Sequence, residues 1–128
     1  MVSNNQKTAR NSVYNRRVQD RQNYLNSIVK KVEKGTGLSV AELKKKYSEE
    51  TLFTVALKHV TTTKKALCKA LNLNIDNACR YKRRKEKDGL LVQSVDEVIC
   101  RYSKHSAHLI STNPKEFEKL THTNQLSL

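Results

Sequence analysis

The sequence contains few of the residues that interrupt helices or bind nucleotide phosphates. Its 128 residues include one proline, three glycines and no tryptophan, and the aromatic side chains are five tyrosines and two phenylalanines. The glycines, Gly35, Gly37 and Gly89, are too scattered to form a P-loop or a dinucleotide-binding loop, which excludes nucleotide binding. With 37% hydrophobic residues, the chain has enough apolar surface for one modest domain with extensions.

Cysteines are few as well, and their spacing fits neither a disulfide framework nor a zinc site. Cys68, Cys79 and Cys100 are odd in number and far apart, which favours free thiols in a reducing compartment. His105 and His108 follow Cys100, but no C-x-x-C pair accompanies them, and zinc prefers closely spaced pairs. We therefore expect no bound metal, and we expect Cys68 and Cys79 to be small buried residues.

Membrane-spanning and catalytic patterns are missing too. No apolar run approaches the length of a membrane span, and the N-terminal residues lack the apolar region of a signal peptide. No pair of carboxylates lies in an apolar setting, and no Ser/His/Asp grouping can be assembled from local motifs. These absences predict a cytoplasmic, nucleoid-associated protein that has no cofactor, no membrane partner and no enzymatic activity.

Positive charge is abundant and is concentrated in two segments. The formal net charge is +13, with eight basic and two acidic side chains in residues 1–34 and nine basic and three acidic in residues 61–88. Charge concentrated in this way indicates a polyanionic partner, most simply nucleic acid, because phosphate contacts supply most non-specific affinity. Neither segment has the strong Leu/Phe/Trp face that helices on membrane surfaces carry.

Residues 61–89 predict two short helices joined by a tight turn. The first helix follows three threonines that can cap it, and its apolar residues recur at helical spacing: Ala66, Leu67, Ala70 and Leu71. Asn72 is expected to end this helix, Leu73 to fill the turn, and Asn74 to cap the second helix. Gly89 lies just past the end of the second helix, where a left-handed backbone is least costly for glycine.

The second helix is expected to pack one face and expose the other. At 100° per residue, Ile75, Ala78, Cys79 and the stem of Lys82 share the packed face, whereas Asn77, Arg80, Arg84 and Lys87 lie opposite with Tyr81 beside them. Arginine bonds guanine bidentately and asparagine bonds adenine, so this outer face suits the major groove. We predict four base-reading residues: Asn77, Arg80, Tyr81 and Arg84. The alternative is that the charged face is only solvated.

After Gly89 the pattern changes from helix to hairpin. Two apolar, β-branched runs, residues 90–100 and 107–112, flank a polar, basic tip at residues 101–106. Three helices followed by a hairpin form the order of a winged helix.

Three stretches of the sequence carry a resemblance to a known family. The chain resembles small winged helix-turn-helix proteins of bacterial mobile elements and phages in three segments: Ala78-Cys79-Arg80-Tyr81, Asp88-Gly89-Leu90-Leu91, and the segment around Cys100 through Ala107–Pro114. The resemblance covers residues 48–114, and it implies a mainly α fold with a small β-hairpin that binds double-stranded DNA with a sequence preference. It also implies a prokaryotic regulator or an accessory factor for replication or recombination, without choosing among these. The family usually places large apolar residues where this chain has Lys82 and Lys85.

Basic residues outside the base-reading set are the expected phosphate contacts: Lys64, Lys65, Arg83, Lys87, Arg101, Lys104, Arg16 and Arg17. A protein-interaction adaptor, in which the charge serves solubility, is the alternative from a different class. RNA binding is disfavoured, because no platform of exposed aromatic side chains is visible beyond Tyr81 and Tyr102.

The N-terminal part of the chain predicts a disordered basic arm at residues 1–10 and a long amphipathic helix at residues 11–34. The helix has one apolar stripe, formed by Val13, Tyr14, Val18, Leu25, Ile28, Val29 and Val32. A stripe of this length has to be buried, so the helix either covers the winged domain or pairs with a second copy in a homodimer.

The other segments complete the predicted organisation. Residues 35–47 form a connector with a short helix, Val40–Tyr47, which a capping box of Ser39 and Glu42 begins. The winged helix domain, residues 48–114, starts with a helix at residues 49–59. Its core-facing residues are expected to be Leu52, Phe53, Val55, Ala56 and Val60. Residues 115–128 form a C-terminal tail with one short docked turn.

Overall fold

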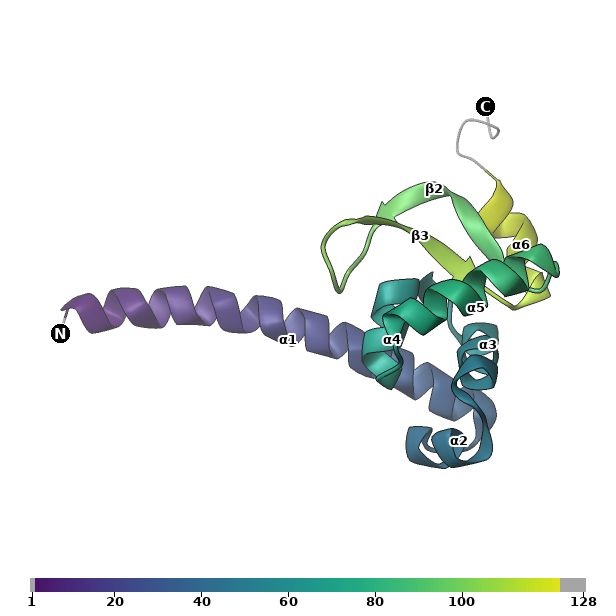
Figure 1. Cartoon of the computed structure of the whole chain (residues 1–128). Coiled ribbons are helices and arrows are strands. Elements are labelled where there is room, and N and C mark those ends of the chain that lie inside the picture. The colour runs from purple at the N-terminus through teal and green to yellow at the C-terminus, as the bar shows by residue number, and fades with distance from the viewer. Residues whose placement is uncertain (1, 123–128) are drawn as a thin grey trace.

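The structure is a computed structural model that describes the backbone of residues 2–122 and the side chains of residues 16–122. Its elements are α1 (Val2–Thr36), α2 (Val40–Lys46), α3 (Glu49–His59), β1 (Thr62–Thr63), α4 (Lys64–Leu71), α5 (Ile75–Lys87), β2 (Val92–Ile99), β3 (Ser106–Ser111) and α6 (Pro114–Thr121). The three strands form an antiparallel sheet in the order β1-β3-β2, and β2 and β3 form its hairpin (Figure 1). The predicted class, mainly helical with a small β-hairpin, is confirmed at this level.

The hydrophobic core lies where α1, α3 and α4 meet the sheet. Its largest fully buried apolar side chains come from all these elements and from α2: Phe53, Ile28, Leu43, Leu52, Leu57, Leu67, Leu71, Ile110 and Val32. Of the residues predicted to face the core from α3, Leu52, Phe53, Ala56 and Val60 are buried. Val55 is only partly buried, and Leu57 takes its place in the core, so this part of the prediction is wrong for one residue.

Helix α1 differs from the prediction at its start. Residues 2–10, for which we expected a disordered arm, continue the helix, and Met1 lies outside the described residues. The sequence before Gly35 contains neither glycine nor proline. Adding residues to a helix that packing has already nucleated costs far less than starting one. The N-terminal half of α1 therefore projects from the body as a straight arm (Figure 1).

The apolar stripe of α1 is divided between the body and the arm. Leu25, Ile28 and Val32 are buried in the core of their own chain, whereas Val18 is 44% exposed. The side chains of Val13 and Tyr14 lie outside the described residues. The C-terminal half of the stripe therefore packs on the body of its own chain, which is one of the two predicted arrangements. A homodimer that used all of residues 11–34 would have to displace this core.

Serine side chains cap the N-termini of α2 and α3, the two helices that follow α1. Ser39 accepts a hydrogen bond from the Glu42 amide at 3.2 Å, and Ser48 accepts one from the Thr51 amide at 3.3 Å. The connector helix α2 ends at Lys46, one residue earlier than predicted. No helix in the described part of the chain is long and apolar enough to span a bilayer.

The hairpin has the predicted strands and one irregularity. The register of β2 against β3 shifts between Gln93 and Glu97. At this irregularity the Ser94 hydroxyl accepts a hydrogen bond from the Leu109 amide of β3 at 2.9 Å. After β3 the chain forms α6, a helix of 8 residues capped by Asn113. Leu120 of this helix is buried, so the described part of the predicted tail is more ordered than the single short turn we expected.

Candidate nucleic-acid interface

Local hydrogen bonds hold the turn between α4 and α5. Asn72 adopts a left-handed conformation (φ 55°), and the Leu73 amide donates to the Cys68 carbonyl at 2.8 Å, which is the bond of a helix C-terminal motif. Asn74 accepts from the Asn77 amide at 2.9 Å and so caps α5. Gly89 has φ 75° just past the helix. The predicted start and end of both helices are confirmed.

The exposed face of α5 is rotated relative to the predicted one. Ala78 is buried, and Tyr81, Lys82 and Lys85 are partly buried, so this side faces the body. The side chains of Asp76, Arg80, Arg83 and Lys87 are exposed. They recur at intervals of four, three and four residues and therefore form one row along the helix. We call Asp76, Arg80, Arg83 and Lys87 the outward row. Ile75, which was expected to pack, is 39% exposed.

The acidic start of α3 binds the side of α5 that we had predicted to face outward. Glu49 accepts hydrogen bonds from the Asn74 amide (3.3 Å), from Asn77 Nδ2 (3.2 Å) and from the Tyr81 hydroxyl (3.1 Å). The Tyr81 ring also lies against Phe53, with 6.1 Å between ring centroids. Asn77 and Tyr81 are thus part of the contact between α3 and α5. The prediction that both side chains face outward from the body is wrong.

Arg84 is a third predicted base-reading residue that has a partner within the chain. Its Nη1 lies 2.7 Å from Glu50 Oε1, although the side chain is 58% exposed. Of the four predicted base-reading residues, Arg80 alone belongs to the outward row. Arg83, predicted to contact phosphate, lies at the middle of this row, and the sequence analysis assigned no role to Asp76. The paired acids Glu49 and Glu50 were the signal that could have indicated which side of α5 turns inward.

Arg80 is positioned by its neighbour on the helix. Its Nη2 donates to Asn77 Oδ1 at 2.9 Å, and Asn77 in turn donates to Glu49. This chain of hydrogen bonds orients one edge of the exposed guanidinium. A guanidinium held in one orientation loses less side-chain entropy when it binds a base or a phosphate.

The predicted phosphate contacts differ in their exposure. Lys64 is partly buried, and its ammonium donates to Cys79 Sγ at 2.9 Å. The other members of this set are exposed: Lys65, Arg83, Lys87, Arg101, Lys104, Arg16 and Arg17. Lys82, at a position that is apolar in the resembling family, packs its stem against the body and pairs with Glu86.

The tip of the hairpin is held against α1. The Arg101 guanidinium stacks over the Tyr24 ring, with 4.8 Å between Cζ and the centroid. Tyr24 also shares a hydrogen bond with the Thr62 hydroxyl at 2.6 Å. Cys100 is buried beneath the tip, 3.0 Å from the Thr63 hydroxyl. The tip is therefore a fixed part of the body, and it presents Arg101 and Lys104 to solvent.

The thiols and imidazoles do not form a metal site. Within residues described by the structure, no group of three or more His, Cys, Asp or Glu side chains could hold a metal ion. Burial raises the pKa of the Cys68 thiol to about 12, so this thiol is protonated at neutral pH. Burial alone would also raise the pKa of Cys100, but hydrogen bonds with Ser103 and Thr63 outweigh it and lower this pKa.

The contact between Glu49 and α5 predicts a pH-dependent stability. Burial alone would raise the pKa of Glu49, but hydrogen bonds from Asn74, Asn77 and Tyr81 outweigh it and hold the pKa below its usual value. A lowered pKa in the folded state stabilises the fold above the carboxyl pKa of the unfolded chain. This contribution is lost as the pH falls through the lower folded value.

We expect the variant Glu49→Gln to lose stability at neutral pH and to show a shallower loss of stability below about pH 5 than the parent protein. Urea unfolding at neutral and acidic pH measures both effects. Glu50→Gln is the matched control, since the Glu50 carboxylate forms its hydrogen bond with the exposed Arg84. An acid profile of Glu49→Gln identical to that of the parent would contradict the assigned role of Glu49.

No protein-family model, curated protein or solved structure matches this chain. We therefore infer function from the residues and their geometry.

Proposed function

We propose that the protein binds double-stranded DNA with a sequence preference, as a winged helix-turn-helix protein whose helix α5 enters the major groove. The observation that carries this proposal is the outward row of α5, in which Arg80, Arg83 and Lys87 are exposed on one side of a capped helix. The element order α3-β1-α4-α5-β2-β3 supports it, because this is the order in which a winged helix arranges its helices and strands.

The length and chemistry of α5 fit a groove. The helix has 13 residues and is about 20 Å long, and the major groove admits one helix. Arg80 and Arg83 supply bidentate donors for guanine, and Asp76, in the first turn, can accept a hydrogen bond from cytosine. Residues near the start of such a helix make the base contacts. Lys87 lies at the other end, where a phosphate contact is expected.

The biological setting follows from the resemblance alone. Small winged helix-turn-helix proteins of mobile elements and phages serve as regulators and as accessory factors in replication or recombination. Either role would use the same DNA-binding surface of α5. We therefore propose a prokaryotic protein of this group and leave the choice between the two roles to the identity of its binding site.

A protein-interaction adaptor is the second candidate, and exposed apolar residues on and next to β2 favour it. Leu90, Val95 and Ile99 are each at least half exposed, and β2 is an edge strand of the sheet. An apolar edge strand is a surface on which a partner chain can add a strand. In this case the charge on α5 would serve solubility, and duplex binding would be weak.

Selection of bound sites from random duplex DNA, followed by a salt titration, separates the two candidates. If DNA is the partner, log affinity should fall against log salt with a slope of about −0.9 per phosphate, or roughly −4 to −8 for about five to nine contacts. Changing Lys65, Lys87 and Lys104 to Gln should make the slope shallower by about 1 for each contact and leave the sequence preference intact.

Lys64→Gln is the matched control for this titration. It removes the same charge from α4 as Lys65→Gln, but the Lys64 ammonium already binds Cys79, so its effect on the slope should be smaller. If no duplex binds at about 50 mM salt, where phosphate contacts are strong, the adaptor is the correct function.

A further inference from the structure

The described side chains of the α1 arm, residues 16–23, are exposed and mainly basic or polar, which suits a polyanion. All eight residues from Arg16 to Asn23 are exposed. They include three arginines, one aspartate and Val18 as the single apolar residue. Side-chain hydrogen bonds from Gln19 to Asn23 and from Gln22 to Asn26 support the helix there. These eight residues form no apolar stripe of the kind that a helix buries against a protein partner.

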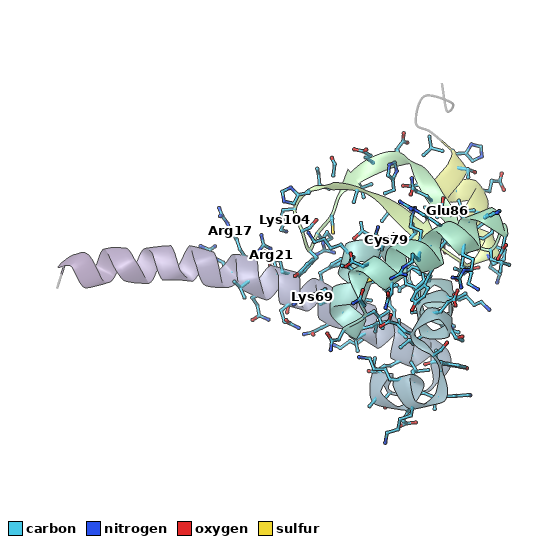
Figure 2. The ribbon with its side chains drawn as sticks, in the orientation of Figure 1. Arg17, Arg21, Lys69, Cys79, Glu86 and Lys104 are labelled. Atoms are coloured by element: carbon cyan, nitrogen blue, oxygen red, sulfur yellow. The ribbon has the colours of Figure 1, made fainter. Side chains whose placement is uncertain are left out.

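The cations of the arm continue into those of the hairpin tip. Arg17 and Arg21 precede Tyr24 by seven and three residues and so lie on the same side of α1. Arg101 of the tip stacks on Tyr24 at 4.8 Å, which brings the two groups together. Figure 2 labels Arg17 and Arg21 on the arm and Lys104 on the hairpin tip, which Arg101 joins to α1. We call Arg17, Arg21, Arg101 and Lys104 the clamp surface.

A basic groove joins the clamp surface to the start of α5. It has a volume of about 300 Å³ and is lined by Lys65, Cys68, Lys69, Asn72, Leu73, Ile75 and Tyr102. Tyr102 is next to Arg101 in the tip, and Ile75 is the first residue of α5. Among the described residues, none that lines this groove is acidic. Positive or neutral side chains therefore line the groove from the start of α5 across α4 to Tyr102 of the hairpin tip.

We propose that the clamp surface binds the phosphate backbone of the duplex beside the site that α5 occupies, so that the arm and the tip act as one clamp on flanking DNA. This inference rests on the proposed function and adds a second contact region to it. The arm from Val2 to Asn23 is about 33 Å long. At 3.4 Å per base pair, it reaches along about 10 base pairs. The protected region should therefore extend by about this length on one side of the selected site.

The first test compares two triple variants of the full chain on a duplex of about 40 base pairs that carries the selected site at its centre. Arg17→Gln/Arg21→Gln/Lys104→Gln removes three charges from the clamp surface. Lys44→Gln/Lys45→Gln/Lys46→Gln removes three charges from exposed residues of α2, which lies on the far side of α4 from the hairpin tip (Figure 1). The clamp variant should lose about 10 base pairs of hydroxyl-radical protection on one side. It should also show a salt slope shallower by about 2 to 3. The control should keep the full footprint.

The second test uses duplex length. The parent protein should bind the long duplex more tightly than a duplex of about 16 base pairs centred on the same site, because the short one lacks the flanking phosphates. The clamp variant should bind both duplexes equally. Two controls show that the triple variant is intact. A retained preference for selected over random DNA shows that α5 still functions, and an unchanged circular dichroism spectrum shows that the fold is kept.

The outcomes distinguish this inference from the proposed function. If the parent protein binds the selected duplex and the clamp variant keeps both the full footprint and the length dependence, the clamp is wrong and the role of α5 stands. If the parent binds no duplex, the proposed function itself fails. Light scattering that shows a parent dimer, which the clamp variant converts to a monomer, would make the arm an interface between copies and also overturn the clamp.

Discussion

Replacing Arg80 and Arg83 by alanine is expected to lower the affinity for a selected duplex far more than the affinity for random DNA. Both side chains belong to the outward row of α5, and each bidentate base contact contributes about 1 to 3 kcal/mol of discrimination. Each contact that is lost should therefore reduce the preference by about 5- to 150-fold. Fluorescence anisotropy with the two duplexes at one salt concentration measures the preference directly.

Arg84→Ala is the matched control for this experiment. It removes the same charge from the same helix, but the Arg84 guanidinium lies 2.7 Å from Glu50. The structure therefore predicts a smaller loss of preference for Arg84→Ala than for Arg83→Ala. The face assigned from the sequence, which was centred on Asn77, Arg80 and Arg84, predicts the reverse order. A larger effect of Arg84→Ala would show that α5 presents this other face to DNA.

Phe53→Ala is expected to give the largest loss of stability. The Phe53 ring is fully buried, and the Tyr81 ring of α5 packs against it. Removal of a buried phenylalanine costs about 3 to 5 kcal/mol of unfolding free energy, through lost apolar transfer and the cavity left behind. This is a large fraction of the roughly 5 to 15 kcal/mol that stabilises a typical domain. Urea unfolding at neutral pH, followed by circular dichroism, measures the effect.

Ile99→Ala is the control for the role of burial. Ile99 is also apolar, but its side chain is 63% exposed, so its removal should change the stability by no more than about 0.5 kcal/mol. Similar losses for Phe53→Ala and Ile99→Ala would contradict the core described above. Since α5 rests on Phe53 through Tyr81, Phe53→Ala should also weaken DNA binding at temperatures where the chain is still folded.

The boundaries of the helices around the turn were determined by the sequence itself. The hydrogen bonds by which Asn72, Asn74 and Gly89 end or begin these helices join residues at most five positions apart. Such bonds form wherever the local chain adopts the required backbone angles, so residue type is enough to predict them. Two apolar, β-branched runs around a polar tip indicated the hairpin in the same local way, and the structure has strands at Val92–Ile99 and Ser106–Ser111.

The face that α5 exposes was decided by the tertiary structure. Asn77 and Tyr81 turn inward because Glu49, 28 and 32 positions earlier in the chain, accepts their hydrogen bonds. The sequence placed Ile75, Ala78 and Cys79 on the packed face; Ala78 is buried as predicted, whereas Cys79 is partly buried and Ile75 is exposed. A helix with so few apolar residues has no strong stripe of its own. The face that α5 turns toward the body therefore depends on the polar groups of α3 that lie against it.

The surfaces against which α1 and the hairpin tip pack were also decided by the tertiary structure. The sequence predicted the long helix and left open whether its stripe packs on the domain or on a second copy. Leu25, Ile28 and Val32 pack into the core, and Tyr24 beside them receives Arg101 from the tip. Residue type and spacing determined the charged segments, the two strands of the hairpin and most helices, because hydrogen bonds and side-chain periods within a few residues control these properties. They did not predict the helix at residues 2–10 or the full length of α6. Which faces meet was decided by burial and polar contacts between residues far apart in the chain, and no local pattern contains that information.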